Sequence, residues 1–141
     1  MGTCIINLNK AQEFKKAVDK YLDESFKDLG LTKLEGLYLA TLFEKDGVSL
    51  IDLTHNVHMD KANTTRVINL LEEKDYVFRK TDEKDSRKFK IFITEKAKKL
   101  KNCVISKMEE FNKIAYNGLT KNEIDTFKLT LSKILSNLNL I

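Results

Sequence analysis

The chain contains no proline, and only five of its 141 residues are glycine. Proline and glycine are the residues that most often interrupt helices and form tight turns. A chain so poor in both has few means of making the many turns that an all-β fold requires. The sequence therefore predicts a mainly α-helical protein whose helices are joined by short connections.

Composition limits the class of protein further. The length fits one domain, with or without dimerisation arms, and an apolar content of 42% is enough for a hydrophobic core. The formal net charge of +4 permits a nucleic acid as partner but does not require one. No window approaches 18 consecutive apolar residues, so no membrane-spanning helix is expected.

The two cysteines indicate a reducing compartment. Cys4 and Cys103 have no CxxC spacing, and the first residues, MGTCIINLNKAQ, do not form a signal peptide. We therefore expect a cytoplasmic protein. Cys103 lies beside an apolar helical stripe and is expected to be partly buried.

Two helices are predicted in the first third of the chain. The first has a stripe of apolar side chains at helical spacing and ends near Gly30. Thr32 and Glu35 then form a T-x-x-E capping box that begins the second helix, which ends at Asp46 and Gly47. The stripe of the first helix consists of Phe14, Val18, Tyr21, Leu22 and Phe26.

A helix-turn-helix is predicted next. Ser49 can cap a short helix over 50–57, and Asp60 can cap another over 61–74, with about four residues between them. The second of these helices has an apolar face and a face rich in hydrogen-bonding groups. The apolar face consists of Thr64, Val67, Ile68 and Leu71; the polar face consists of Lys61, Asn63, Arg66 and Asn69, with Ala62 and Thr65 at its margins.

A β-hairpin should follow. Residues 76–81 and 88–94 are rich in β-branched and aromatic residues, which favours strands. The segment between them, DEKDSR, predicts a charged hairpin tip.

Two helices are predicted at the C-terminus. A long helix should begin at Thr94 and end at Gly118, and a second capping box, Thr120 with Glu123, should begin the last helix. The last helix has apolar residues at alternating spacings of three and four, which is the pattern of a helix-packing seam. The seam consists of Ile124, Phe127, Leu131, Ile134 and Leu138, and Ile141 continues it.

The terminal helices have too little local core to cover their apolar faces, which predicts a homodimer. We expect residues 1–30 and 95–141 to form dimerisation helices and residues 31–94 to form a separate lobe. A two-fold axis would present two copies of the helix-turn-helix about one turn of DNA apart, on a pseudo-palindromic site.

Residues 31–97 resemble the winged helix-turn-helix of the MarR family of transcriptional regulators. The resemblance lies in LT at 31–32, LLEEKDYVFR at 70–79, DEKDSR at 82–87 and IFITEKA at 91–97. Four positions depart from the family pattern: Lys84 stands in place of Arg, Ile93 in place of Leu, and Asp75 and Ala97 in place of Gly. Lys84 cannot form the planar bidentate contacts of an arginine.

The resemblance implies double-stranded DNA as the partner. The helix over 61–74 would enter the major groove, where Asn63 could pair with adenine, Arg66 with guanine or phosphate, and Thr64 or Thr65 with phosphate or a thymine methyl. The spacing of Thr64 also places it toward the core. The expected contact residues of this helix are Lys61, Ala62, Asn63, Thr65 and Arg66.

The resemblance assigns the hairpin to the minor groove. Arg87 would enter the groove, and Asp85 would hold its guanidinium in place. The expected contact residues of the wing are Lys84, Asp85, Arg87 and Lys88. The alternative is a solvated tip with a weak surface ion pair.

The resemblance also implies a small-molecule effector, for which Tyr21, Phe26, Tyr38 and Phe43 are candidate lining residues; each is otherwise an ordinary core residue. The function that the resemblance predicts is a ligand-responsive repressor. No catalytic motif is present, so an enzyme is not expected.

Alternatives are a thiol-based oxidation sensor using Cys4 and a winged-helix protein–protein interaction module. No cofactor is expected, and His55 with His58 is too small a set for a metal site.

Overall fold

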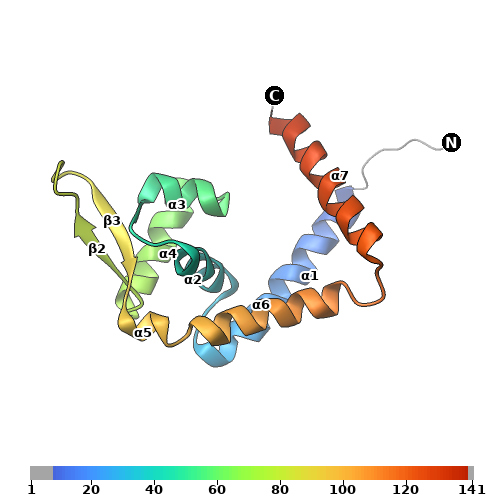
Figure 1. The fold of residues 1–141 in the computed structure, drawn as a ribbon, viewed down its shortest axis with the longest axis horizontal. Coiled ribbons are helices and arrows are strands. Elements are labelled where there is room, and N and C mark those ends of the chain that lie inside the picture. Colours follow the sequence, from blue (N-terminus) through green and yellow to red (C-terminus); the bar gives the residue numbers. More distant parts are fainter. Residues whose placement is uncertain (1–7, 140–141) are drawn as a thin grey trace. The chain divides into compact units, whose positions relative to one another are not determined.

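The computed structural model describes residues 8–139 and is mainly helical, with a small antiparallel sheet (Figure 1). The predicted fold class is confirmed. The elements are α1 (Leu8–Phe26), a 3₁₀ turn (Lys27–Leu29), α2 (Lys33–Glu44), β1 (Val48–Ser49), α3 (Leu50–Val57), α4 (Lys61–Glu73), β2 (Val77–Thr81), β3 (Phe89–Ile93), α5 (Glu95–Lys98), α6 (Lys101–Ala115) and α7 (Lys121–Asn139).

Side-chain caps explain where the helices of the lobe begin. The hydroxyl of Thr32 accepts from the backbone N–H of Glu35 at 3.2 Å, and Glu35 Oε1 accepts from the N–H of Thr32 at 3.0 Å. Ser49 caps α3 and Asp60 caps α4 in the same manner, with Asp60 Oδ1 lying 2.7 Å from the N–H of Asn63. These contacts satisfy N–H groups that a helix leaves without intrahelical partners, so the predicted starts are correct.

The chain divides into two compact units at Met108. The first unit contains a continuous hydrophobic core in which α2, α3 and α4 meet the sheet. Nine apolar side chains of this unit are no more than 1% exposed and lie on these elements: Tyr38, Leu39, Leu42, Leu53, Val67, Ile68, Leu71, Val77 and Ile91.

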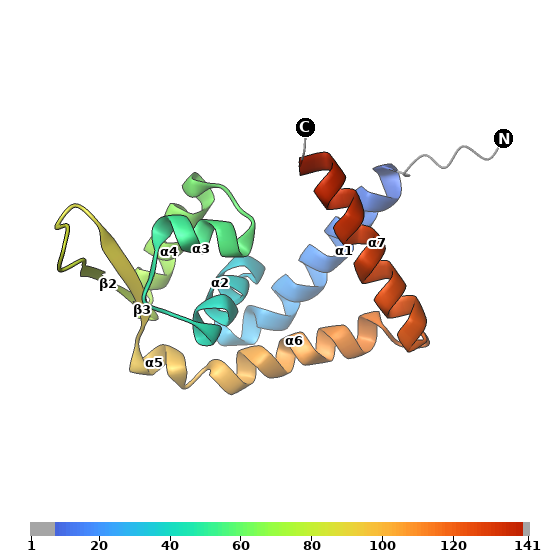
Figure 2. The ribbon, with the colours of Figure 1, turned by 45° about the horizontal axis from the view of Figure 1, so that its top comes forward.

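The sheet has strand order β1-β3-β2, and all its pairings are antiparallel. In the hairpin, Val77 lies opposite Ile93 and Thr81 lies opposite Phe89. Figure 2 shows this hairpin, the wing, projecting from the helices of the first unit. β1 pairs with the other edge of β3, with Val48 opposite Ile91. The sequence did not predict β1, because two residues are too few to show an alternating pattern.

Within residues 8–139, two non-glycine residues have positive φ angles, and both lie at turns. His58 ends α3 with φ 55°, and Asp75 follows α4 with φ 62°. The left-handed conformation is most easily adopted by glycine. This explains why a glycine is expected at position 75 in the family that the sequence resembles. Asp75 and Thr94 join the helix to the wing, because the Thr94 hydroxyl donates to the Asp75 carbonyl at 2.7 Å.

The prediction of one continuous helix from Thr94 to Gly118 was wrong. The structure has α5 and α6 instead, separated at Lys99 and Leu100. The N–H of Leu100 bonds to the carbonyl of Ala97 at 2.9 Å, an i→i−3 bond that tightens the turn. Ala97 and Val104 are both fully buried across this break. Apolar periodicity continues through such a turn, so it could not reveal the interruption.

The second unit contains all of α7 and the end of α6. α7 begins with the predicted capping box, because both the Thr120 and the Glu123 contacts are present at 3.1 Å. Among residues 109–139 none is buried. The seam residues Phe127, Leu131 and Leu138 are 48%, 40% and 56% exposed, whereas Ile141 lies outside the described residues. No described helix is both long enough and apolar enough to cross a membrane.

Candidate nucleic-acid interface

One face of α4 is sealed into the core of the first unit. Thr64, Val67, Ile68 and Leu71 are buried, as their spacing predicts. The Thr64 hydroxyl lies 2.9 Å from the Tyr38 hydroxyl and 3.0 Å from the carbonyl of Asp60. The suggestion that Thr64 could contact a phosphate or a thymine methyl is therefore wrong, because its side chain faces α2.

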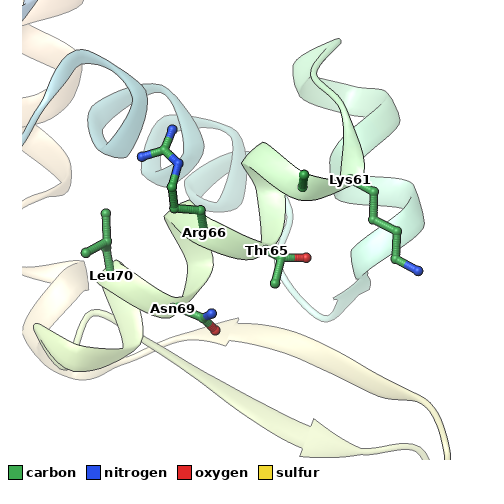
Figure 3. A pocket seen from close by; sticks show the side chains of 6 residues that line it. Lys61, Thr65, Arg66, Asn69 and Leu70 are labelled. Atoms are coloured by element: carbon green, nitrogen blue, oxygen red, sulfur yellow. The ribbon is translucent and has the colours of Figure 1, made fainter.

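The opposite face of α4 forms an open groove (Figure 3). The sequence placed Ala62 and Thr65 at the margins of the polar face, but both line the groove itself. Six side chains line the groove: Lys61, Ala62, Thr65, Arg66, Asn69 and Leu70. The groove thus combines two cations, two polar groups and small apolar surfaces, which are the groups that contact phosphates and base edges.

Asn63 lies on the flank of this groove. Its Oδ1 accepts a hydrogen bond from Arg66 Nη2 at 3.1 Å. A bidentate contact with adenine uses both the oxygen and the nitrogen of the amide. Oδ1 has two lone pairs, so the Arg66 bond leaves it able to accept a second bond from adenine. Any turn of the amide that this pairing needs costs little, because the Arg66 bond is solvent-exposed.

The wing tip is organised by aspartates that bond to backbone N–H groups. Asp82 accepts from the N–H of Lys84 at 2.8 Å, and Asp85 accepts from the N–H of Arg87 at 3.0 Å. These are the Asx turns that let aspartate replace glycine or proline in a tight connection. The carbonyl of Lys88 accepts from Asp82 at 2.9 Å and closes the loop.

Arg87 extends from this tip with its side chain 89% exposed. Its Nε lies 3.2 Å from Asp85 Oδ1 and its Nη2 lies 3.5 Å from Asp85 Oδ2. The expected ion pair is therefore present. The side-chain hydrogen bond from Arg87, followed by its backbone N–H, lowers the pKa of Asp85 below its usual range. Asp85 is thus ionised at neutral pH and orients the guanidinium outward.

Arg79 connects the wing to α4, which the sequence did not predict. Its Nη2 donates to Asn69 Oδ1, and its Nε lies 3.7 Å from Glu72 Oε2, an ion-pair distance rather than a hydrogen bond. Its guanidinium also stacks over the Phe89 ring, 4.8 Å from the centroid. Arg79 therefore joins β2, β3 and the outer face of α4.

A second connection fixes the C-terminal end of α4. Glu35 is only 1% exposed, and Lys74 Nζ lies 2.7 Å from its Oε2 and 3.0 Å from its Oε1. Lys74 Nζ also donates to the carbonyl of Gly30 at 2.8 Å. The ion pair ties α4 to the start of α2. The sequence identified Glu35 only as a capping residue, because nothing local indicates a partner 39 residues away.

The candidate effector residues lie in or beside the core. Phe26 and Tyr38 are fully buried, Phe43 is 9% exposed, and Tyr21 is half-buried. A Cβ placed on Gly36 would lie 2.6 Å from the Phe26 ring, so no space remains there. Burial raises the pKa of Tyr38. Effector contact at these residues stays a prediction, and their role in packing is observed.

The two histidines and Cys103, which lie within the described residues, do not form a recognisable site. His58 ends α3, and residues 8–139 contain no group of three or more His, Cys, Asp and Glu side chains placed to hold a metal. Cys103 is exposed in the chain, so the prediction of a partly buried position was wrong. Cys4 lies outside the described residues.

A helix-turn-helix with a polar groove on its second helix and a basic wing beside it defines a winged-helix DNA-binding protein. Comparisons with known proteins place the chain within that class. The MarR family model matches residues 31–89. HTH-type transcriptional regulator BilQ from Clostridioides difficile is 32% identical over 111 residues, which cover 72% of this chain and 74% of the relative.

Two further comparisons cover more of the chain. YybA from Bacillus subtilis, an uncharacterized HTH-type transcriptional regulator, is 29% identical over 123 residues, covering 87% of this chain and 82% of the relative. A MarR family transcriptional regulator from Listeria monocytogenes, solved in complex with a 26mer DNA, is 27% identical with a TM-score of 0.85. That match covers 93% of this chain and 87% of the other.

The chain belongs to the MarR family of transcriptional regulators. It is a DNA-binding protein of a family whose members regulate transcription and are not enzymes.

Proposed function

We propose that the protein is a homodimeric repressor that binds a pseudo-palindromic operator through α4 and the wing and responds to a small molecule. The observation that carries this proposal is the two-sided construction of α4. Its inner face is sealed into the core and its outer face forms a polar groove, so the helix is rigid where it presents side chains. Rigid presentation is what sequence-specific contact with base edges requires.

The groove residues divide by chemistry into two roles. Lys61 is an exposed cation at the start of α4 and is suited to a phosphate oxygen. Arg66 can donate two parallel bonds to guanine, Asn63 can pair with adenine, and Thr65 and Ala62 offer methyl groups to thymine. The operator would therefore be read by the first two turns of α4.

The wing would add a minor-groove contact. Arg87 is exposed and its guanidinium is paired with Asp85, so it can reach the DNA without first leaving a packed position. The negative potential of a narrow minor groove favours such a cation. Lys84 and Lys88 flank the tip and would contact phosphates as point charges.

The second unit supports the homodimer. None of its described residues is buried, and its α7 seam exposes Phe127, Leu131 and Leu138. Such a seam gains stability by packing against another helix. In the proposed assembly residues 1–30 and 95–141 pair two chains, and residues 31–94 bind one half-site each. Half-sites would then lie about one helical turn apart.

An effector would act through the aromatic cluster beneath α4. The hydroxyl of Tyr38 is hydrogen-bonded to that of Thr64 on α4. A molecule that displaced Tyr38 would therefore disturb α4 at its second turn. Because Phe26 and Tyr38 are buried, the effector must favour a second arrangement of the dimer in which this cluster opens. Repression would be relieved as the population shifts to that arrangement.

The test is anisotropy of labelled duplexes across a salt series. One duplex carries the DNA upstream of the protein's own gene, and a scrambled duplex is the control. Binding through phosphates should fall linearly on a log–log plot against salt, with a slope of about −0.9 per phosphate. Arg87→Ala should weaken binding, whereas Lys113→Ala, an exposed cation in the second unit, should not.

The outcomes separate the proposals. Selective, salt-sensitive binding that depends on Arg87 supports the repressor and the minor-groove contact. Equal and weak binding to both duplexes, unchanged in Arg87→Ala, contradicts the proposal for this DNA. It would direct attention to a protein partner of the wing, which a pull-down with the full chain would detect.

A further inference from the structure

We propose that Asn69 determines base specificity at one position of the operator. Arg79 would hold the side-chain amide of Asn69 in one orientation, in which only its hydrogen-bond donors face the DNA. This inference rests on the proposed binding of α4 in the major groove and adds a third turn of the helix to the reading surface. Asn69 is exposed and lines the groove together with Thr65 and Arg66 (Figure 3).

Arg79 is held from several sides, so it is a firm anchor. Its guanidinium stacks over the Phe89 ring and lies at ion-pair distance from Glu72, and its side chain is 29% exposed. Stacking of a planar guanidinium on an aromatic ring restricts its orientation. The Arg79–Asn69 bond and the Arg66–Asn63 bond are both solvent-exposed, so the ring stacking and the contact with Glu72 are what distinguish Arg79.

The chemistry of arginine decides which way the Asn69 amide points. A guanidinium has only donors, so the atom that meets Arg79 Nη2 must be the amide oxygen. The oxygen is turned toward the strands of the wing, and the Nδ2 group lies on the other side of the amide (Figure 3). Two N–H donors are then available to the groove, and the acceptor is directed toward the wing instead.

This orientation predicts which base edges Asn69 can contact. Donors pair with guanine O6 or N7, with thymine O4, or with adenine N7, and they meet the amino group of cytosine unfavourably. The bidentate pairing of asparagine with adenine is disfavoured at this position, because Arg79 holds the oxygen toward the wing and the pairing needs both the oxygen and the nitrogen of the amide to face the base. Asn69 and Asn63 therefore differ in function although they are the same residue.

The test is selection from a library of randomised duplexes with full-length protein, followed by comparison of base preferences at each position. Asn69→Ala removes the donors. Asn69→Asp keeps the acceptor for Arg79 and replaces the donors with an oxygen. Asn102→Ala, an exposed asparagine on α6, is the matched control.

We expect the wild type to disfavour cytosine at one position of each half-site. Asn69→Ala should reduce that discrimination about tenfold at this position alone, with an unchanged salt slope. Asn69→Asp should shift the preference there toward cytosine, although its charge lowers affinity for every duplex. Asn102→Ala should change neither quantity.

Arg79→Met tests the positioning role while keeping an apolar stem against Phe89. It should weaken discrimination at the same position, and the double variant with Asn69→Ala should lose no more than Asn69→Ala alone. A circular dichroism melt identifies a variant that has failed to fold; Arg79→Lys, which keeps a donor near Asn69, then replaces it and should lose less discrimination.

Three results would overturn the inference. Base preferences unchanged at every position in both Asn69 variants would remove Asn69 from base contact. A uniform loss of affinity with a shallower salt slope would assign Asn69 to a phosphate instead. Strictly additive effects of the two substitutions would separate Arg79 from Asn69. Failure of the wild type to select any sequence is a different result, which contradicts the proposed function itself.

Discussion

The two units of the chain use the same helical pattern with opposite results. In the first unit, the apolar stripes of α2, α3 and α4 converge with the sheet, and residues such as Leu53 and Ile68 lose all exposure. In the second unit, the seam of α7 is equally regular, yet Phe127, Leu131 and Leu138 stay 40–56% exposed. Periodicity therefore identifies the face that needs a partner, but not whether the partner belongs to the same chain.

The two capping boxes show the same contrast. Thr32 with Glu35 and Thr120 with Glu123 make the same reciprocal bonds. Glu35 is buried and also pairs with Lys74, whereas Glu123 is exposed. In the second unit the capping box therefore serves only to begin a helix. In the first unit its glutamate also fixes the C-terminal end of α4.

The largest effect should come from placing a charge in the α7 seam. Leu131→Asp would bury a carboxylate in the proposed dimer contact, at a cost of several kcal/mol or more. We expect monomers in sedimentation velocity and loss of operator affinity. Lys133→Glu, an exposed position on the same helix, is the control. A Leu131→Asp protein that remains dimeric would contradict pairing through this seam.

The next largest effect should come from truncating one leucine in each unit, because the two units should respond differently. Leu53→Ala should lower the free energy of unfolding by about 2–5 kcal/mol, because Leu53 is fully buried. Leu131→Ala should chiefly change the concentration dependence of unfolding, because its packing partner would be another chain. Urea denaturation at two protein concentrations measures both. Equal, concentration-independent losses would remove the distinction drawn between the units.

The buried ion pair gives a smaller effect. Lys74→Met leaves Glu35 buried without its cation; because Lys74 is partly exposed, we expect about 1–3 kcal/mol of lost stability. Glu35→Gln in the same protein should recover part of the loss. Lys121→Met breaks the exposed pair with Asp125 and should cost about 0–1 kcal/mol. Similar losses from both lysines would contradict the tie between α2 and α4.

Alkaline pH provides the smallest test. Burial raises the pKa of Tyr38, so the unfolded chain releases this proton at a lower pH than the folded chain. The protonated Tyr38 hydroxyl makes its whole contribution to stability below the ordinary tyrosine pKa of about 10. This contribution is lost as the pH rises through and above that value. Tyr38→Phe should cost about 0.5–1.5 kcal/mol at neutral pH through the lost Thr64 bond.

The difference in free energy of unfolding between wild type and Tyr38→Phe should then decrease as the pH is raised from 8 to 11, as measured by urea denaturation. A gap that stays constant over this range would show that Tyr38 does not titrate with unfolding.

Local signals predicted most of the fold. The caps at Thr32, Ser49 and Asp60 and the stripes of the helices gave the starts and the buried faces of α2, α3 and α4. These local signals could not predict β1, which forms a strand only because it pairs with β3. They also could not predict the tightened turn at Leu100. Both depend on contacts between segments rather than on local composition.

The site was predicted less completely. Four of the six groove residues, Lys61, Ala62, Thr65 and Arg66, were expected contact residues from the resemblance. The spacing of α4 placed Asn69 on the polar face but not among the expected contacts, because its proposed role depends on Arg79, which lies on a different element. Its position three residues after Arg66 was the available signal. The Glu35–Lys74 pair had no local signal at all.

Hydroxyl-radical footprinting of the protein on the duplex that it binds tests the central claim most directly. The account predicts two protected segments whose centres lie about 10–10.5 base pairs apart. In Arg87→Ala, the flanking minor-groove protection should be lost and the central protection retained. A single protected segment, or protection that does not change in Arg87→Ala, would contradict a paired winged-helix reading of DNA.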